Sequence, residues 1–183
     1  MKNKLIATAT ATGILFMIFG FSWKNPENPE PTLKQVLLDQ LKSTHNQAEW
    51  FVPVNVAIQG LTAEQAMWQD KPGVHSIGQL THHIIFWNER QLAMFKGDKQ
   101  SDYNGKNEET FTSLDKNQWA DAVKKMDRVL SDWESAITAA DEAKLKSWYV
   151  TISRISTHNA YHTGQIIYIR KLQGSWDDKN GVK

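Results

Sequence analysis

Two histidines four residues apart, His158 and His162, have the spacing in this sequence that most directly suggests chemistry. They lie between Ile152 and Leu172, a stretch with the apolar periodicity of an α-helix. Residues four apart share one helical face, so both imidazoles are expected to point into the buried stripe. Two such rings either find separate hydrogen-bond partners in the core or bind one divalent ion. A third ligand from a neighbouring helix would leave an open position on that ion for water or substrate.

The residue types around this pair disfavour two familiar metal sites. A zincin-type protease helix has Glu directly after its first His, and this chain has Asn159 there. The sequence contains no Glu-x-x-His, which the carboxylate di-metal bundles use. It also contains no cysteine, so it has no thiol or disulfide chemistry of its own. The remaining hypothesis is a site built from imidazoles.

A second predicted helix, over residues 76–97, offers a third histidine. His82 and His83 are adjacent and therefore point about 100° apart, so at most one of them faces the core squarely. The helical neighbours of His83 are the more apolar, which favours His83 as the inward ring. If the two helices pack together, His83 can complete a three-histidine site with His158 and His162. The alternative is that His83 hydrogen-bonds across the bundle without an ion.

Four further residues are candidates for supporting the site or contacting a substrate. Asn159, Tyr161 and Gln165 belong to the helix that carries the histidine pair. Each either supports a ligand or substrate or is ordinary helix surface and packing. His45, on the first predicted helix, either faces the metal cavity or packs away from it, and we favour the second. No Asp or Glu is identified beside the histidines, so no catalytic side chain is assigned.

Helices of bundle length must position these residues. The first begins at Thr32 and ends or kinks near Pro53, and the others span 76–97, 115–140 and 152–172. They are joined by a short connector helix over 61–69, a long polar loop over 98–113 and a link over 141–147. Capping-box spacings, with Gln three residues after the cap, occur at Thr32, Thr62, Ser76 and Asp115. Because no segment reads convincingly as a strand, the sequence predicts an all-α four-helix bundle with a long crossover connection.

The chain divides into four parts, which we place at residues 1–22, 23–31, 32–176 and 177–183. The first has a basic head and an uncharged run, and resembles a secretory signal peptide more than a membrane span. Retention as an N-terminal anchor is the alternative. A proline-rich linker, the helical bundle and a polar tail follow. We therefore expect an exported protein, periplasmic or anchored facing outward, rather than a cytoplasmic one.

Composition limits the partners of the bundle. The 183 residues, 40% of them apolar and eight of them Trp, suffice for one domain with a substantial core. The formal net charge of +1 does not indicate nucleic-acid binding.

Two motifs give the chain a resemblance to a known family. S-I-G-Q-L-x-x-H begins at Ser76, and H-x-x-x-H-x-G-Q begins at His158. Together they resemble the DinB-like superfamily of bacterial metal-binding bundles, including the metal-dependent hydrolases of the YfiT kind, over residues 32–176. The resemblance implies a divalent ion on His83, His158 and His162. Imidazoles suit zinc, nickel, copper and iron, and we expect zinc or nickel. An amino-terminal leader departs from a family that is largely intracellular.

Two functional hypotheses follow from the motifs and the resemblance. One is a metal-dependent enzyme of hydrolase or transferase type, which activates water or a small thiol toward an unknown small-molecule substrate. The other is a non-catalytic bundle that binds a metal or a small ligand. A catalytic site leaves the ion open to solvent, whereas a structural site is closed by a fourth protein ligand such as His45. A homodimer formed through exposed aromatic surface is compatible with either hypothesis.

Overall fold

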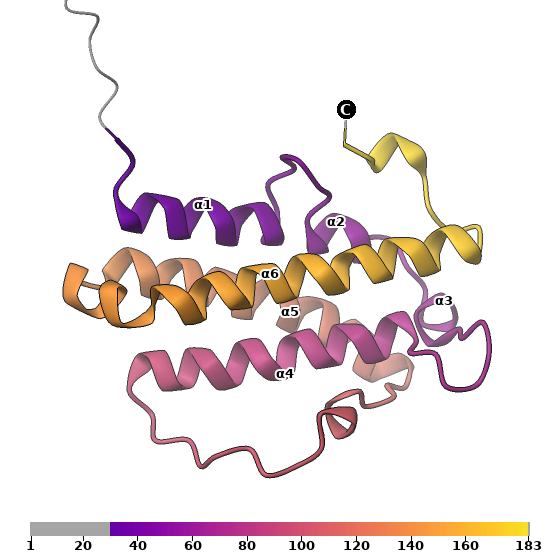
Figure 1. Cartoon of the computed structure of the whole chain (residues 1–183). Coiled ribbons are helices and arrows are strands. Elements are labelled where there is room, and N and C mark those ends of the chain that lie inside the picture. Colours follow the sequence, from indigo (N-terminus) through magenta and orange to yellow (C-terminus); the bar gives the residue numbers. More distant parts are fainter. Residues whose placement is uncertain (1–29, 183) are drawn as a thin grey trace, which may run out of the picture. The chain divides into compact units, whose positions relative to one another are not determined.

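Residues 30–182 are described by the computed structural model, and they fold into six α-helices and two short 3-10 helices (Figure 1). This part of the chain contains no β-strand, and the all-α prediction is confirmed. None of its helices has the length and apolar character needed to cross a bilayer. The predicted leader over 1–22 and nearly all of the predicted linker over 23–31 lie outside the described residues.

Four long helices form the bundle, and their bounds are α1 Leu33–His45, α4 Ile77–Lys96, α5 Lys116–Ala139 and α6 Glu142–Leu172. In Figure 1, α6 lies in front, α5 behind, α1 above and α4 below. Both α1 and α4 pack against α5 and against α6. Their inward faces join in one apolar core, whose fully buried side chains include Leu37, Leu41, Ile84, Met126, Trp133 and Ile166.

Capping boxes form at the four predicted positions, Thr32, Thr62, Ser76 and Asp115. In each, the cap side chain accepts from the backbone N–H of the Gln three residues later, and the Gln side chain accepts from the backbone N–H of the cap. Each box satisfies two N–H groups that the first helical turn leaves free. The predicted starts of α1, α3, α4 and α5 are therefore correct.

Two predicted boundaries are wrong. The first helix ends at His45, because Asn46 leaves the helical backbone region. A short helix, α2 (Val54–Ile58), follows Pro53, and α3 (Ala63–Met67) lies inside the predicted connector. The predicted link over 141–147 is the start of α6, where Asp141 accepts from the Lys144 N–H as the N-cap. Its polar residues are the exposed face of a helix.

The long connection after α4 makes α4 and α5 run in the same direction. Glu89 of α4 contacts Lys125 of α5, and Lys96, further along α4, contacts Asp132, further along α5. Contacts that move in the same direction along both helices are expected for a parallel pair. The connection returns along α4 (Figure 1) and carries the 3-10 helix η1, Asn107–Thr110. The predicted long crossover is therefore present, and it brings η1 into contact with α4.

Candidate metal centre

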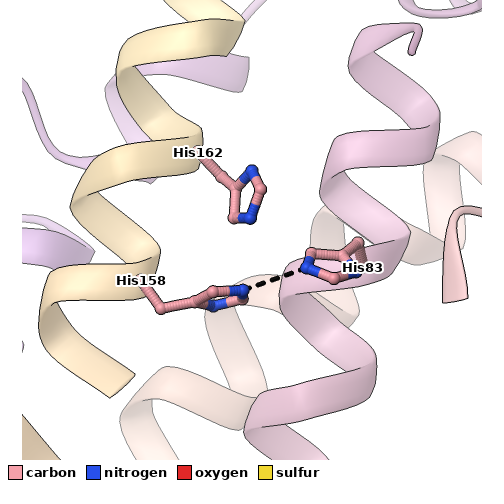
Figure 2. A group of neighbouring side chains, drawn as sticks. All are labelled: His83, His158 and His162. Atoms are coloured by element: carbon pink, nitrogen blue, oxygen red, sulfur yellow. Dashed lines mark hydrogen bonds between the residues drawn. The ribbon is translucent and has the colours of Figure 1, made fainter. Parts of the chain in front are cut away.

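The structure brings His83 of α4 together with His158 and His162 of α6 (Figure 2). The Nε2 atoms of His83 and His158 are 3.0 Å apart, and one ring nitrogen from each of the three residues lies within 4.8 Å of the others. Two nitrogens that bind one zinc ion in tetrahedral geometry, each at a Zn–N distance of 2.0–2.1 Å, would be about 3.3 Å from each other. The cluster therefore has the dimensions for one ion, with small rotations of the rings.

Thr110 of η1 fixes the orientation of His83. The Thr110 hydroxyl donates to the Asn107 carbonyl oxygen at 2.6 Å, so its oxygen accepts from Nδ1–H of His83. The Thr110 carbonyl oxygen accepts from Nδ1–H of His82 at 2.8 Å. The ring of Phe111 stacks on His83 with centroids 3.9 Å apart. With Nδ1 protonated, the lone pair of His83 is on Nε2, which faces the other two histidines.

His162 is oriented by Gln165, one of the candidates from the sequence. Nδ1 of His162 lies 2.6 Å from Gln165 Oε1, an acceptor, so this nitrogen carries the proton. The Gln165 amide NH₂ donates to the Tyr161 hydroxyl at 3.4 Å. The second ring nitrogen of His162 is therefore free to bind an ion. The donor set fits a divalent ion, because Thr110 and Gln165 hold the opposite nitrogens of two of the three rings.

All three rings are neutral at neutral pH. Burial lowers the pKa of His83 to about 3, with the nearby His162 and His158 rings adding to the effect. Burial, and then His162, lowers the pKa of His158 to about 4. The pKa of His162 is also lowered, chiefly by burial. A neutral imidazole keeps the lone pair that a metal ion needs.

A cleft of about 450 Å³ opens beside the cluster and is lined by all three histidines. His83 and His162 are only 2% and 7% exposed, whereas Tyr161, also in its wall, is 65% exposed. Glu108 of η1 lies in the same wall, with its Oε1 atom 3.5 Å from Nε2 of His75. The cleft therefore gives small molecules a route to an ion on the histidines.

Sequence reasoning missed four residues of this site, and all of them lie in or beside loops. Glu108, Thr110 and Phe111 belong to the segment predicted only as a long polar loop. His75, in the loop before α4, stacks on the outer face of Phe111 with centroids 3.8 Å apart. The one available signal was compositional, since an otherwise polar segment contains two aromatic residues, Tyr103 and Phe111, and the adjacent carboxylates Glu108 and Glu109.

Two of the sequence candidates have other partners. Asn159 is completely buried, and its side-chain oxygen accepts from the Asn88 amide at 2.7 Å, so it bridges α6 and α4 within the core. This contact supports the packing alternative that the sequence left open for Asn159, because a buried amide such as Asn88 requires a hydrogen-bond partner. His45 packs between α1 and α5, with Nδ1 2.7 Å from Glu134 and Nε2 3.0 Å from Asp127. His45 is therefore not a member of the cluster.

We expect His45→Leu to lower the free energy of unfolding by about 2–4 kcal/mol, because two carboxylates lose the group between them. Zinc stoichiometry should be unchanged, since His45 contacts none of the three clustered histidines. Urea denaturation and elemental analysis measure the two effects. The exposed position Asp39 on the same helix is the control, and Asp39→Leu should change stability by no more than about 0.5 kcal/mol. Loss of zinc from a folded His45→Leu variant would contradict the conclusion that His45 stabilises the fold without taking part in the metal centre.

We expect Thr110→Val to weaken zinc binding roughly 10- to 100-fold, because His83 loses the acceptor that fixes its tautomer and ring orientation. Competition with a chromophoric chelator measures the affinity. Thr112→Val is the matched control two residues away, at an exposed position, and should bind zinc as the wild type does. Equal affinities for both variants would show that Thr110 does not orient a ligand.

A family model described as the DinB superfamily matches residues 54–166, more than half of the chain. The match begins at α2 and ends within α6, and it includes all three clustered histidines and Gln165. No curated protein and no solved structure matches the sequence significantly.

Proposed function

The chain belongs to the DinB superfamily, and from that premise we propose that it binds one divalent ion, zinc or nickel, and is a metal-dependent enzyme. The ligands are His83, His158 and His162. The convergence of three neutral imidazoles at the wall of a cleft carries this proposal. In the described part of the chain, no fourth His, Asp or Glu joins the cluster. Three protein ligands leave an open position, as in catalytic zinc sites.

A bound divalent ion supplies Lewis acidity, which promotes loss of a proton from water or a thiol and polarises a carbonyl group. Thr110 and Gln165 hold the ligand rings, and Phe111 covers one face of His83 and excludes water there. Glu108 is the carboxylate in the cleft wall and accepts the proton of the nucleophile. His75, within 3.5 Å of Glu108, passes that proton toward solvent. This is the chemistry of a hydrolase or of a thiol-dependent transferase.

A non-catalytic metal- or ligand-binding bundle is the alternative, and one contact favours it. The His83 and His158 Nε2 atoms are close enough for one ring to donate a hydrogen bond to the other without an ion. For the catalytic hypothesis, export would reduce access to cytosolic thiols and would favour water over a thiol as the nucleophile.

The two alternatives differ in whether a small molecule can reach the ion. We expect the visible spectrum of the cobalt-loaded protein to change saturably when 2-mercaptoethanol or azide is added, because either can occupy an open position. Cobalt-loaded Glu108→Gln should respond similarly to azide, since Glu108 is proposed to move a proton and not to bind the ion. A spectrum insensitive to both additives would mean that the site is closed, and would support the non-catalytic alternative.

A further inference from the structure

Arg154 lies one helical turn before His158 on α6, so their side chains emerge from the same face about 6 Å apart along the axis. Arg154 and His158 together line two clefts of about 590 and 440 Å³. The walls of the first include Tyr149, Val150 and Tyr161, and those of the second include Trp87, Gln91 and Ile155. A molecule in either cleft can reach both the metal ligand and the guanidinium group.

Among residues 30–182, Arg154 is the only Asp, Glu, Lys or Arg in the walls of these two clefts. Within residues 30–182, no ion pair joins Arg154 to an acidic residue. The other three arginines are differently placed. Arg90 and Arg170 donate to backbone carbonyl oxygens, and Arg128 lines a groove that also contains acidic side chains. Within the described residues, Arg154 is thus an exposed positive charge without an acidic partner, one helical turn from His158.

A guanidinium group in such surroundings is suited to binding an anion. Its planar donors match the two oxygens of a carboxylate, and the bond is stronger away from competing charges. The aromatic and aliphatic side chains in the cleft walls favour an apolar body on the same molecule. The four-residue spacing sets Arg154 and His158 one helical turn apart, roughly 6 Å along the axis, so one small molecule can span the two side chains.

We propose that Arg154 binds the carboxylate of the substrate, and that the substrate is a small organic carboxylate with an apolar or aromatic body. This inference rests on the proposed function, because His158 is taken to hold the ion that acts on the other end of the molecule. Arg154 is then the residue that selects acids over neutral molecules of the same shape.

Binding of 3-phenylpropionate and of neutral 3-phenylpropionamide to the zinc-loaded full chain tests this proposal by calorimetry. We expect the carboxylate to bind at least about 10-fold more tightly than the amide. Arg154→Gln should weaken carboxylate binding roughly 10- to 100-fold and change amide binding less than about threefold. Arg154→Lys should keep part of the preference for the carboxylate over the amide, and the control Arg128→Gln should keep all of this preference.

Three outcomes overturn the proposal. One is equal binding of carboxylate and amide to the wild type. Another is unchanged carboxylate binding in Arg154→Gln, which would place the carboxylate on the ion. The third is no binding of the carboxylate at all. Zinc content, measured first on each protein, separates this failure from that of the proposed function. One zinc per chain with no effect of Arg154 overturns the inference alone, whereas no zinc in the wild type overturns both.

Discussion

Replacement of both His158 and His162 by alanine is expected to lower the affinity for zinc by about 1000-fold or more. Structural zinc sites bind with about 10–16 kcal/mol, and a 1000-fold loss corresponds to about 4 kcal/mol, so the removal of two of three ligands is sufficient to cause it. The remaining ring, His83, is held by Thr110 but would act as a single ligand. Elemental analysis after dialysis, followed by competition with a chromophoric chelator, measures the change.

The matched control alters two exposed residues of the same helix. Thr157 and Tyr168 are exposed positions of α6, so Thr157→Ala with Tyr168→Ala makes two truncations without touching a ligand or the Gln165 contact. This control should retain one zinc per chain, and both proteins should keep their helical circular dichroism. One zinc per chain in the variant without His158 and His162 would show that the ion binds elsewhere.

The second large effect concerns stability. Zinc at a free concentration 100-fold above its dissociation constant should raise the free energy of unfolding by about 2.7 kcal/mol, since the site exists only in the folded chain. For a chain of this size, that corresponds to a rise in Tm of roughly 5–10 °C. Thermal unfolding with zinc and with EDTA measures the shift.

The EDTA-treated protein should remain folded, because the main apolar core does not depend on the histidines. Trp133, Leu130 and Met126 of α5 are buried without contributing to the cluster. Coincident unfolding curves with zinc and with EDTA would contradict a site that couples α4 to α6. A shift of the same size in the variant without His158 and His162 would show that zinc stabilises the bundle through another site.

The parts of the fold that could be predicted are those with local physical causes. Apolar periodicity located the four long helices, and local hydrogen bonding in the capping boxes located the starts of α1, α3, α4 and α5. The same periodicity distinguished His83 from His82, and the structure buries His83 while leaving His82 partly exposed. The start of α6 was placed too late because its first turns expose most of their side chains. Such a polar stretch is typical both of a loop and of the solvent-facing side of a helix.

Residues whose roles depend on distant partners could not be assigned from the sequence. Thr110 contacts His83 only because the long connection folds back along α4, and nothing periodic marks that segment. The role of Asn159 depends on its hydrogen bond with Asn88, 71 positions away in the sequence. The role of His45 depends on two carboxylates of α5. Contacts of this kind are set by tertiary packing, which local patterns do not encode.

The central claim is that three imidazoles hold one divalent ion and leave a position open. X-ray absorption spectroscopy at the zinc edge, on the zinc-loaded full chain, tests it most directly. We predict one zinc per chain with three imidazole nitrogens and one additional nitrogen or oxygen ligand, all at about 2.0–2.1 Å. Failure to retain zinc, or zinc surrounded only by oxygen ligands, would contradict the claim and leave three histidines that hydrogen-bond within the core.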